Sequence, residues 1–171
     1  MNEKGLVSSA AAMLVAATCL AADAPQVPVP AAPGAAGSVI ANGKTIPIRY
    51  VYARAIPDPQ FPGRDQAAMF LSDRPLVLSD AAWQGGAGDV DFEGLFLSVS
   101  ENGRVSYLKV RQGTLDYGTM GQKMDGFEWA NGVVKGQETD YGDHEGQRIS
   151  YGIAFNTPIA KAKAKPRAKK R

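Results

Sequence analysis

Apolar and polar residues alternate in short runs along the middle of the chain, and turn residues separate the runs. The clearest run is 149–155, where a large apolar residue occupies every second position from Ile149 to Phe155. Residues 95–100 and 104–111 show the same period on either side of a short polar turn. Because successive side chains of a strand point to opposite faces, this period predicts half-buried β-strands.

Three Asn-Gly pairs, at 42–43, 102–103 and 131–132, lie between these runs. Asn and Gly tolerate the positive φ angles that both central positions of a type I′ turn require. The pairs therefore predict three antiparallel hairpins with type I′ turns. In the middle hairpin Val105, Val110 and either Tyr107 or Leu108 compete for the inner face, a conflict that a β-bulge resolves.

The run 46–52 places Ile46, Ile48, Tyr50 and Tyr52 on one face, and Pro47, which cannot donate to a ladder, predicts an edge position. Residues 68–72, 126–130 and 133–135 supply further strands, and Ser79 before helix formers predicts one short helix over 79–84. We therefore predict an all-β fold: an antiparallel sandwich or small barrel of seven to eight strands, with at most one short helix.

The first 24 residues have the three regions of a secretory signal peptide. Lys4 precedes an apolar stretch over 5–20, and Ala22-Asp23-Ala24 forms a small-residue cleavage site. Cleavage removes Cys19, the only cysteine, and with it any disulfide, thiolate nucleophile or cysteine metal site. The alternative is a lipoprotein signal in which Cys19 is acylated. We expect a periplasmic or secreted protein with no transmembrane span after cleavage.

Composition divides the remaining chain into three parts. Residues 25–37 hold four prolines and predict a Pro/Ala-rich spacer, residues 38–160 form the β domain, and residues 161–171 form a disordered basic tail. Residues 38–160 carry eleven Lys and Arg against fifteen Asp and Glu, whereas the last eleven residues hold seven of the nineteen basic side chains. The overall net charge of +2 thus conceals an acidic domain with a cationic tail.

The order of several short motifs resembles that of a group of small exported bacterial β-rich proteins, to which no activity is assigned. The resemblance implies the fold and the location, and it carries no site residues. The motifs are Asn42-Gly43-Lys44, residues 50–54 (Tyr-Val-Tyr-Ala-Arg), residues 70–76 (Phe-Leu-Ser-Asp-Arg-Pro-Leu), residues 149–155 (Ile-Ser-Tyr-Gly-Ile-Ala-Phe) and Pro158-Ile159.

Two groups of polar residues offer candidate chemistry. Asp89, Asp91 and Glu93 imitate the start of a calcium loop, although Ser100 stands where the bidentate glutamate of such a loop belongs. The only histidine, His144, lies in a polar segment over 140–145, which we interpret as a loop before the last strand. A general base at His144, or a pair of carboxylates, defines one alternative function, a small hydrolase. No cofactor and no catalytic residue is assigned.

Several aromatic residues near loops either line a surface for a sugar or peptide or fill a thin core, and we favour core filling. They are Phe61, Trp83, Phe92, Trp129, Tyr117 and Tyr141.

The tail predicts attraction to anionic surfaces. We expect an exported, non-catalytic binding or envelope-associated module, with an anionic envelope surface or an unidentified protein or glycan as its partner. Without export, the same tail predicts a nucleic-acid-binding protein. The arm residues are Lys161, Lys163, Lys165, Arg167, Lys169, Lys170 and Arg171.

Overall fold

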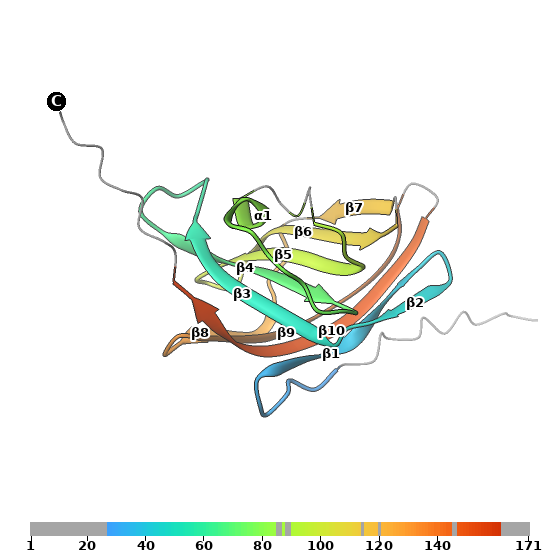
Figure 1. The fold of residues 1–171 in the computed structure, drawn as a ribbon, viewed down its shortest axis with the longest axis horizontal. Coiled ribbons are helices and arrows are strands. Elements are labelled where there is room, and N and C mark those ends of the chain that lie inside the picture. The colour runs from blue at the N-terminus through green and yellow to red at the C-terminus, as the bar shows by residue number, and fades with distance from the viewer. Residues whose placement is uncertain are drawn as a thin grey trace, which may run out of the picture.

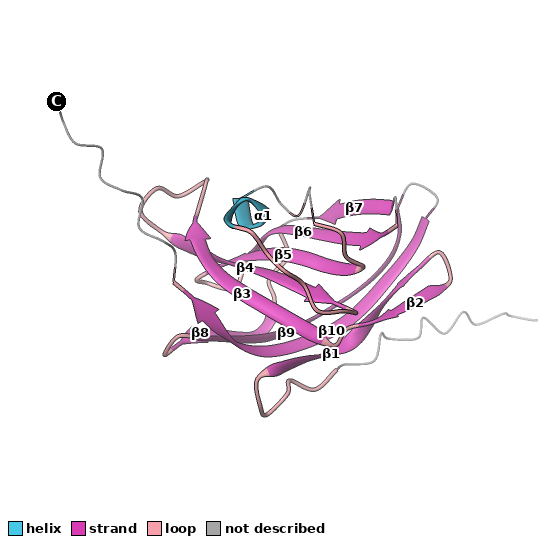
Figure 2. Cartoon of the chain, viewed as in Figure 1, coloured by secondary structure: helices cyan, strands magenta, loops and turns pink. Residues whose placement is uncertain are grey.

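The computed structural model describes residues 27–84, 87, 90–113, 115–119, 121–144 and 147–161. Within these residues the chain forms ten strands and one short helix, which confirms the predicted all-β class and exceeds the predicted number of strands (Figures 1 and 2). The elements are β1 (Gly34–Ala41), β2 (Lys44–Pro47), β3 (Tyr50–Pro57), β4 (Asp65–Ser72), α1 (Asp80–Gln84), β5 (Gly94–Ser100), β6 (Val105–Gln112), β7 (Leu115–Thr119), β8 (Asp125–Ala130), β9 (Val133–His144) and β10 (Gln147–Ala160).

The strands form two sheets that meet along β10. One sheet has the order β2-β1-β10-β9-β8 and the other β3-β4-β5-β6-β7. Neighbours are antiparallel except at the junction, where the end of β10 runs parallel to β3 and Ile159 lies opposite Ala53. Figure 1 shows β10 crossing the molecule from β2 to β3. Along the described strands this order does not close into a barrel.

A second connection joins the sheets at the opposite side of the core. Residues 121–124, which lead directly into β8, hydrogen-bond to residues 103–105 at the start of β6. The Val105 amide donates to the Gln122 carbonyl at 2.9 Å, and the Met124 amide donates to the Gly103 carbonyl at 2.9 Å. This segment therefore belongs to the turn region of one sheet and to the first residues of the other.

The main core lies between the sheets and is largely aliphatic. The run 149–155 points its large residues inward as predicted, and Leu71, Leu97 and Val110 of the facing sheet are fully buried against them. Partly buried Phe127 and Trp129 from β8 cover its margin. The period of two in the sequence thus marks the face that each of these strands buries.

The hairpin turns agree with prediction at two of the three Asn-Gly pairs. Asn42 and Gly43 have φ angles of 48° and 77°, and Asn131 and Gly132 have 52° and 74°, as a type I′ turn requires. The prediction is wrong at 102–103, where only Gly103 has a positive φ, 82°. The Gly103 amide donates to the Ser100 carbonyl, which makes a three-residue loop closed by a glycine bulge. A loop of this length needs one left-handed residue rather than two.

The predicted bulge in the β5–β6 hairpin is confirmed. The register shifts between Ser98, which lies opposite Tyr107, and Val99, which lies opposite Val105. Ser106 is the additional residue, so Val105, Leu108 and Val110 all reach the inner core while Tyr107 lies on the outer face. The shift resolves the competition between Tyr107 and Leu108 in the sequence.

The run 46–52 is not one strand with one buried face. β2 is an edge strand, as Pro47 predicts, but the chain changes sheets after it. The Ile48 amide donates to the Gly37 carbonyl in the first sheet, and the Arg49 amide donates to the Ser72 carbonyl in the second. Tyr52 therefore packs on the outer face of the second sheet, while Ile46 and Ile48 lie in the inner core. The predicted common face is wrong because a corner reverses the alternation.

β1 begins inside the segment that we expected to be a spacer. Gly34 to Gly37 pair with β10, and a Cβ atom at Gly37 would lie 2.0 Å from the Gly152 carbonyl oxygen. The two backbones approach too closely for any side chain at this position. The Asn156 side chain also donates to the Pro30 carbonyl at 3.0 Å, so the end of the proline-rich segment contacts the domain.

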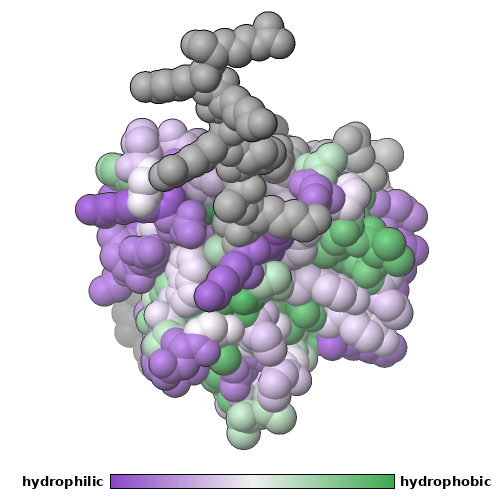
Figure 3. Space-filling model, turned by 60° about the vertical axis from the view of Figure 1, so that its left-hand side comes forward, coloured by the Kyte–Doolittle hydropathy of each residue, from purple (hydrophilic) through white to green (hydrophobic). Residues whose placement is uncertain are grey.

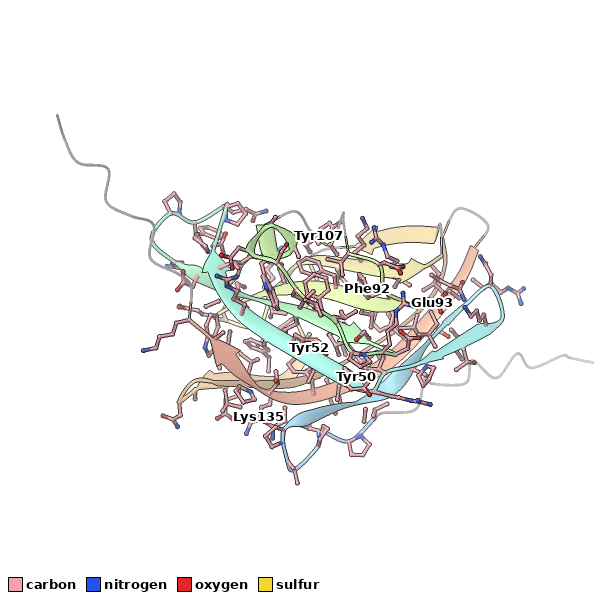
Figure 4. All side chains as sticks on the ribbon, in the orientation of Figure 1. Tyr50, Tyr52, Phe92, Glu93, Tyr107 and Lys135 are labelled. Atoms are coloured by element: carbon pink, nitrogen blue, oxygen red, sulfur yellow. The ribbon has the colours of Figure 1, made fainter. Side chains whose placement is uncertain are left out.

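A second, aromatic core covers the outer face of β3–β6 beneath the long connection over residues 73–93, which we name the strap. Phe70 makes ring contacts with Trp83, Phe92 and Phe96 at centroid distances of 5.1, 5.4 and 4.8 Å. The strap contains the predicted helix α1, and the hydroxyl of the preceding residue, Ser79, accepts the Ala82 amide at 3.3 Å. Figure 4 shows Tyr52, Phe92 and Tyr107 lying along this sheet. β4 is consequently buried on both faces.

Candidate functional site

A cleft of about 820 Å³ lies where the β3–β4 loop meets the β5–β6 turn. Its walls come from strand ends and turns, so it presents side chains rather than a strand edge. The lining residues are Asp58, Gln60, Phe61, Arg64, Asp65, Ser100, Glu101, Asn102, Arg104, Val105, Ser106 and Gly121.

The first wall is a loop that its own sequence holds in shape. Buried Asp58 accepts the backbone amides of Gln60 and Phe61 at 2.7 and 3.1 Å. The Arg64 amide donates to the Phe61 carbonyl across Pro62-Gly63, and Gly63 has a φ of 85°. Proline followed by a left-handed glycine is the pair that a type II turn requires. The loop therefore presents Phe61, 53% exposed, with the Arg64 guanidinium 5.7 Å from its ring centroid.

The second wall is the three-residue turn of the β5–β6 hairpin. The Asn102 side-chain oxygen accepts the Arg104 amide at 3.2 Å and the Ser100 hydroxyl at 2.6 Å. At the floor, the Ser106 hydroxyl of the bulge donates to the buried Gln66 side chain at 2.7 Å. The bulge thus places a hydroxyl on the cleft side of β6 and fixes its orientation.

Charges of both signs line the cleft without neutralising one another. Arg64 and Arg104 are exposed, and within the described part of the chain neither lies at ion-pair distance from a carboxylate. Asp65 and Glu101 also belong to the lining. Figure 3 turns the left-hand side of Figure 1 forward, and the described surface there is mainly hydrophilic with apolar side chains in small groups. The cleft offers hydrogen-bonding groups and one exposed ring.

The basic arm leaves the domain close to this cleft. Lys161 is exposed and follows β10 directly, and the preceding Ala160 lies opposite Arg54 of β3. β3 continues from there into the loop that carries Phe61. The other six predicted arm residues lie outside the described residues: Lys163, Lys165, Arg167, Lys169, Lys170 and Arg171.

Glu138 on β9 is the charged residue that the sequence analysis missed. It lies in the inner core opposite fully buried Ile153 and is 7% exposed. Burial, followed by the nearby carboxylates of Asp125 and Asp140, raises its pKa from the ordinary 4.5 to about 7, against a smaller lowering by a hydrogen bond with Gln122. The alternation of Val134, Gly136 and Glu138 places Glu138 on the inward face of β9, a position that charged residues seldom occupy.

The predicted calcium residues do not converge where the structure describes them. Asp91 pairs with Arg74 at 3.0 Å, and Glu93 pairs with Lys44 at 2.8 Å. Phe92 between them is buried in the aromatic core. Asp89 lies outside the described residues, and within those residues no three metal-ligating side chains gather.

The segment over 140–144 is part of a strand, so its interpretation as a loop is wrong. Pairing with the apolar strand β10 extends β9 to His144, which lies opposite Gln147. The side chains of His144, Tyr141 and Tyr117 lie outside what the structure describes. Of the other aromatic candidates, Trp83 and Phe92 fill the outer core, Trp129 packs on the inner core, and Phe61 alone lines the cleft.

Comparison with protein-family models, curated proteins and solved structures gives no match. Among the described residues, no helix has the length and apolar character needed to cross a membrane. The case for a function therefore depends on the cleft, the arm and the charges around them.

Proposed function

We propose that this protein is an exported, non-catalytic binding module of the cell envelope. Its end cleft binds a glycan, and its cationic arm associates with an anionic surface. One observation carries the proposal: the root of the arm at Lys161 and the cleft lie at the same end of the domain. A surface that attracts the arm would hold its polymer within reach of the cleft.

The chemistry of the cleft favours a glycan over a peptide. Extended peptides commonly bind by adding a strand to an exposed sheet edge, whereas this cleft is built from turns and strand ends. Sugars combine an apolar ring face with neighbouring hydroxyl groups. Phe61 offers a flat apolar surface, and Arg104, Asp65 and Asn102 offer planar polar groups that match paired hydroxyls.

The arm supports reversible association rather than anchoring. Each Lys or Arg near an anionic membrane contributes up to about 1 kcal/mol before salt screens it. Seven such residues within the last eleven positions make the attraction collective and dependent on ionic strength. The acidic balance of residues 38–160 opposes binding through the rest of the domain.

Co-sedimentation with insoluble chitin, cellulose and peptidoglycan tests the cleft. Phe61→Ala should lose binding to whichever polymer retains the wild type, and Tyr50→Ala, which removes a 39% exposed aromatic side chain outside the cleft lining, should keep it. Retention of all three proteins alike, or of none on any polymer, would refute the glycan assignment. Binding that a synthetic peptide competes away would point to a peptide ligand instead.

Sedimentation with phosphatidylglycerol vesicles tests the arm. A chain ending at Ala160 should lose the vesicle binding of the full chain, and the full chain should release as salt rises. Vesicle binding unchanged by the truncation would refute the tether. Duplex DNA in a parallel titration tests the alternative of a nucleic-acid-binding protein, which also requires that the leader is retained.

A hydrolase remains the rival from a different class, and Glu138 is the observation that favours it. A carboxyl group with a pKa of about 7 suits a general acid. Its burial opposes direct contact with a polymer in the cleft, because only 7% of the residue is exposed. Release of soluble sugar from the polymer that binds, lost in Glu138→Gln, would support the hydrolase over the binding module.

A further inference from the structure

One short segment belongs both to the cleft and to the surroundings of Glu138. We name residues 121–126 the connecting strip. Gly121 lines the cleft, Gln122 hydrogen-bonds to Glu138, and Met124 is buried in the inner core. The strip is held to the β5–β6 turn by the backbone bonds of Val105 and Met124 described above and by the Gly121 amide, which donates to Val105 at 2.8 Å.

The described charged groups that shift the pKa of Glu138 are two carboxylates. Asp125 acts on it from the strip and the start of β8, and Asp140 acts from the same face of β9. β10 places Ile153 opposite it and the phenol of Tyr151 one inward position further along. Lys135, three residues before Glu138 and on the opposite face of β9, pairs with Glu128. The side chain of Lys123 in the strip is exposed, and its backbone forms an isolated antiparallel β-bridge with Arg104.

We propose that protonated Glu138 keeps the connecting strip on the β5–β6 turn and that ionised Glu138 releases it, so that pH controls the shape of the cleft. The control of glycan binding rests on the function proposed above, whereas the release of the strip does not.

The physical basis is the cost of a third negative charge at this position. Ionised Glu138 is desolvated and faces two carboxylates, and the Gln122 amide offsets only part of this cost. Asp125 lies within the strip, next to Gly126, whose φ is 56°, and the register of β8 shifts between Asp125 and Glu128. Repulsion therefore acts on the least regular part of the junction, where the chain gives way before the paired strands do.

Amide hydrogen exchange of the full chain between pH 5.5 and 8.5, corrected for the intrinsic effect of pH, tests the release. Protection of the Gly121, Met124 and Val105 amides should fall at least about tenfold between pH 5.5 and pH 8.5 in the wild type and stay constant in Glu138→Gln. Glu128→Gln, a matched change on the outer face of β8, should behave as the wild type. Equal protection at both pH values in the wild type, or an unchanged fall in Glu138→Gln, would overturn the proposal.

Two further variants keep the test decisive should Glu138→Gln not fold. Asp125→Asn removes one repelling charge, which lowers the pKa of Glu138 toward its ordinary value, and should therefore make the loss of protection smaller. His144→Gln removes the only histidine of the chain and should leave the transition where it is. A transition that His144→Gln abolishes assigns the effect to the histidine and refutes the proposal.

Affinity for the polymer that retains the wild type, measured at the same two pH values, separates this proposal from the proposed function. If no polymer binds, the proposed function fails while hydrogen exchange still decides whether Glu138 releases the strip. If a polymer binds, its affinity should change across pH 7 in the wild type and not in Glu138→Gln. Binding that is equally independent of pH in both proteins would overturn the control of the cleft.

Discussion

The two faces of the β3–β6 sheet are buried by different means. The inner face packs against another sheet through aliphatic side chains from regular strands. The outer face packs against the strap through rings, and the regular structure within the described part of that cover is a helix of five residues. The difference shows that one sheet can have a core on one face that strand pairing positions and a core on the other face that a connecting segment, the strap, positions.

Polar contacts hold the strap at several points. Arg54 pairs with Asp80 at 2.7 Å, and Lys44 contacts both carboxylate oxygens of Glu93 at 2.8 Å. The Tyr52 hydroxyl accepts the Leu76 amide at 2.9 Å, and Arg111 donates to the Val90 carbonyl. The residues of the inner face are positioned instead by the backbone hydrogen bonds between paired strands. We therefore expect the outer core to open before the inner core does.

The two tryptophans report on the two cores separately. Trp83 lies in the outer core, and Trp129 packs on the inner core. Trp129→Phe and Trp83→Phe each retain one tryptophan. Fluorescence during denaturant titration of the two variants therefore compares the unfolding of the outer core with that of the inner core.

The largest expected effect comes from Phe70→Ala in the outer core. Phe70 is fully buried and contacts three rings, so its truncation should lower the free energy of unfolding by about 4 kcal/mol. Chemical denaturation measures the loss, and Trp83 should report an earlier transition than Trp129. Val77→Ala on the exposed part of the strap is the control and should change little. Coincident transitions in Phe70→Ala would show that the two cores are one cooperative unit.

The next effect concerns Glu138, a buried charged residue on the inner side of the molecule. Because its folded pKa of about 7 lies above the ordinary 4.5, the folded state binds the proton more tightly than the unfolded state does. The stabilisation is fully present below pH 4.5 and is lost as pH rises through 7, a change of about 3 kcal/mol. Denaturation at a series of pH values should show this slope in the wild type and a reduced slope in Glu138→Gln. An equal slope in both would assign the pH dependence to other groups.

Local sequence patterns predict the parts of the fold that depend on strand alternation and turn residues. Residues 149–155 and the Asn-Gly turns at 42–43 and 131–132 follow local rules, since alternation determines the buried face and the turn residues determine the turn type. β4 is buried on both faces, so its sequence shows a continuous apolar run and no period. The corner after Ile48 depends on the Ile48 amide bonding to Gly37 in one sheet and the Arg49 amide bonding to Ser72 in the other, which no local pattern encodes.

The candidate site was less predictable because it combines distant segments. The Pro62-Gly63 turn that presents Phe61 is visible in the sequence, but the β5–β6 turn that faces it is more than 30 residues away. Glu138 is noticeable as a charge at an inward position, yet its pKa depends on Asp125 and Asp140 lying close to it. Burial and proximity are tertiary properties, so only the separate residues could be proposed in advance.

A smaller effect should follow from removing the cap of the strap helix. Ser79→Ala deletes the hydroxyl that accepts the Ala82 amide, which costs about 1 kcal/mol at a helix start. The loss should appear in the transition that Trp83 reports, because α1 belongs to the outer core. Ser79→Asp retains an acceptor and should restore the transition. A loss reported equally by Trp129 would mean that the helix supports both cores.

The smallest effect is expected at the ion pair between Lys44 and Glu93, which fastens the end of the strap to the β1–β2 hairpin. The Lys44 side chain is 58% exposed and that of Glu93 is 26% exposed, so solvent and salt screen the pair. Glu93→Gln should therefore lower the free energy of unfolding by about 0.5 kcal/mol, and the difference should shrink in high salt. Glu128→Gln, which removes the Lys135 pair far from the strap, is the matched control. If Glu93→Gln lowers the midpoint of the Trp83 transition no more than Glu128→Gln does, this ion pair does not hold the strap. The difference between the inner and outer cores then depends on aromatic packing rather than on charge.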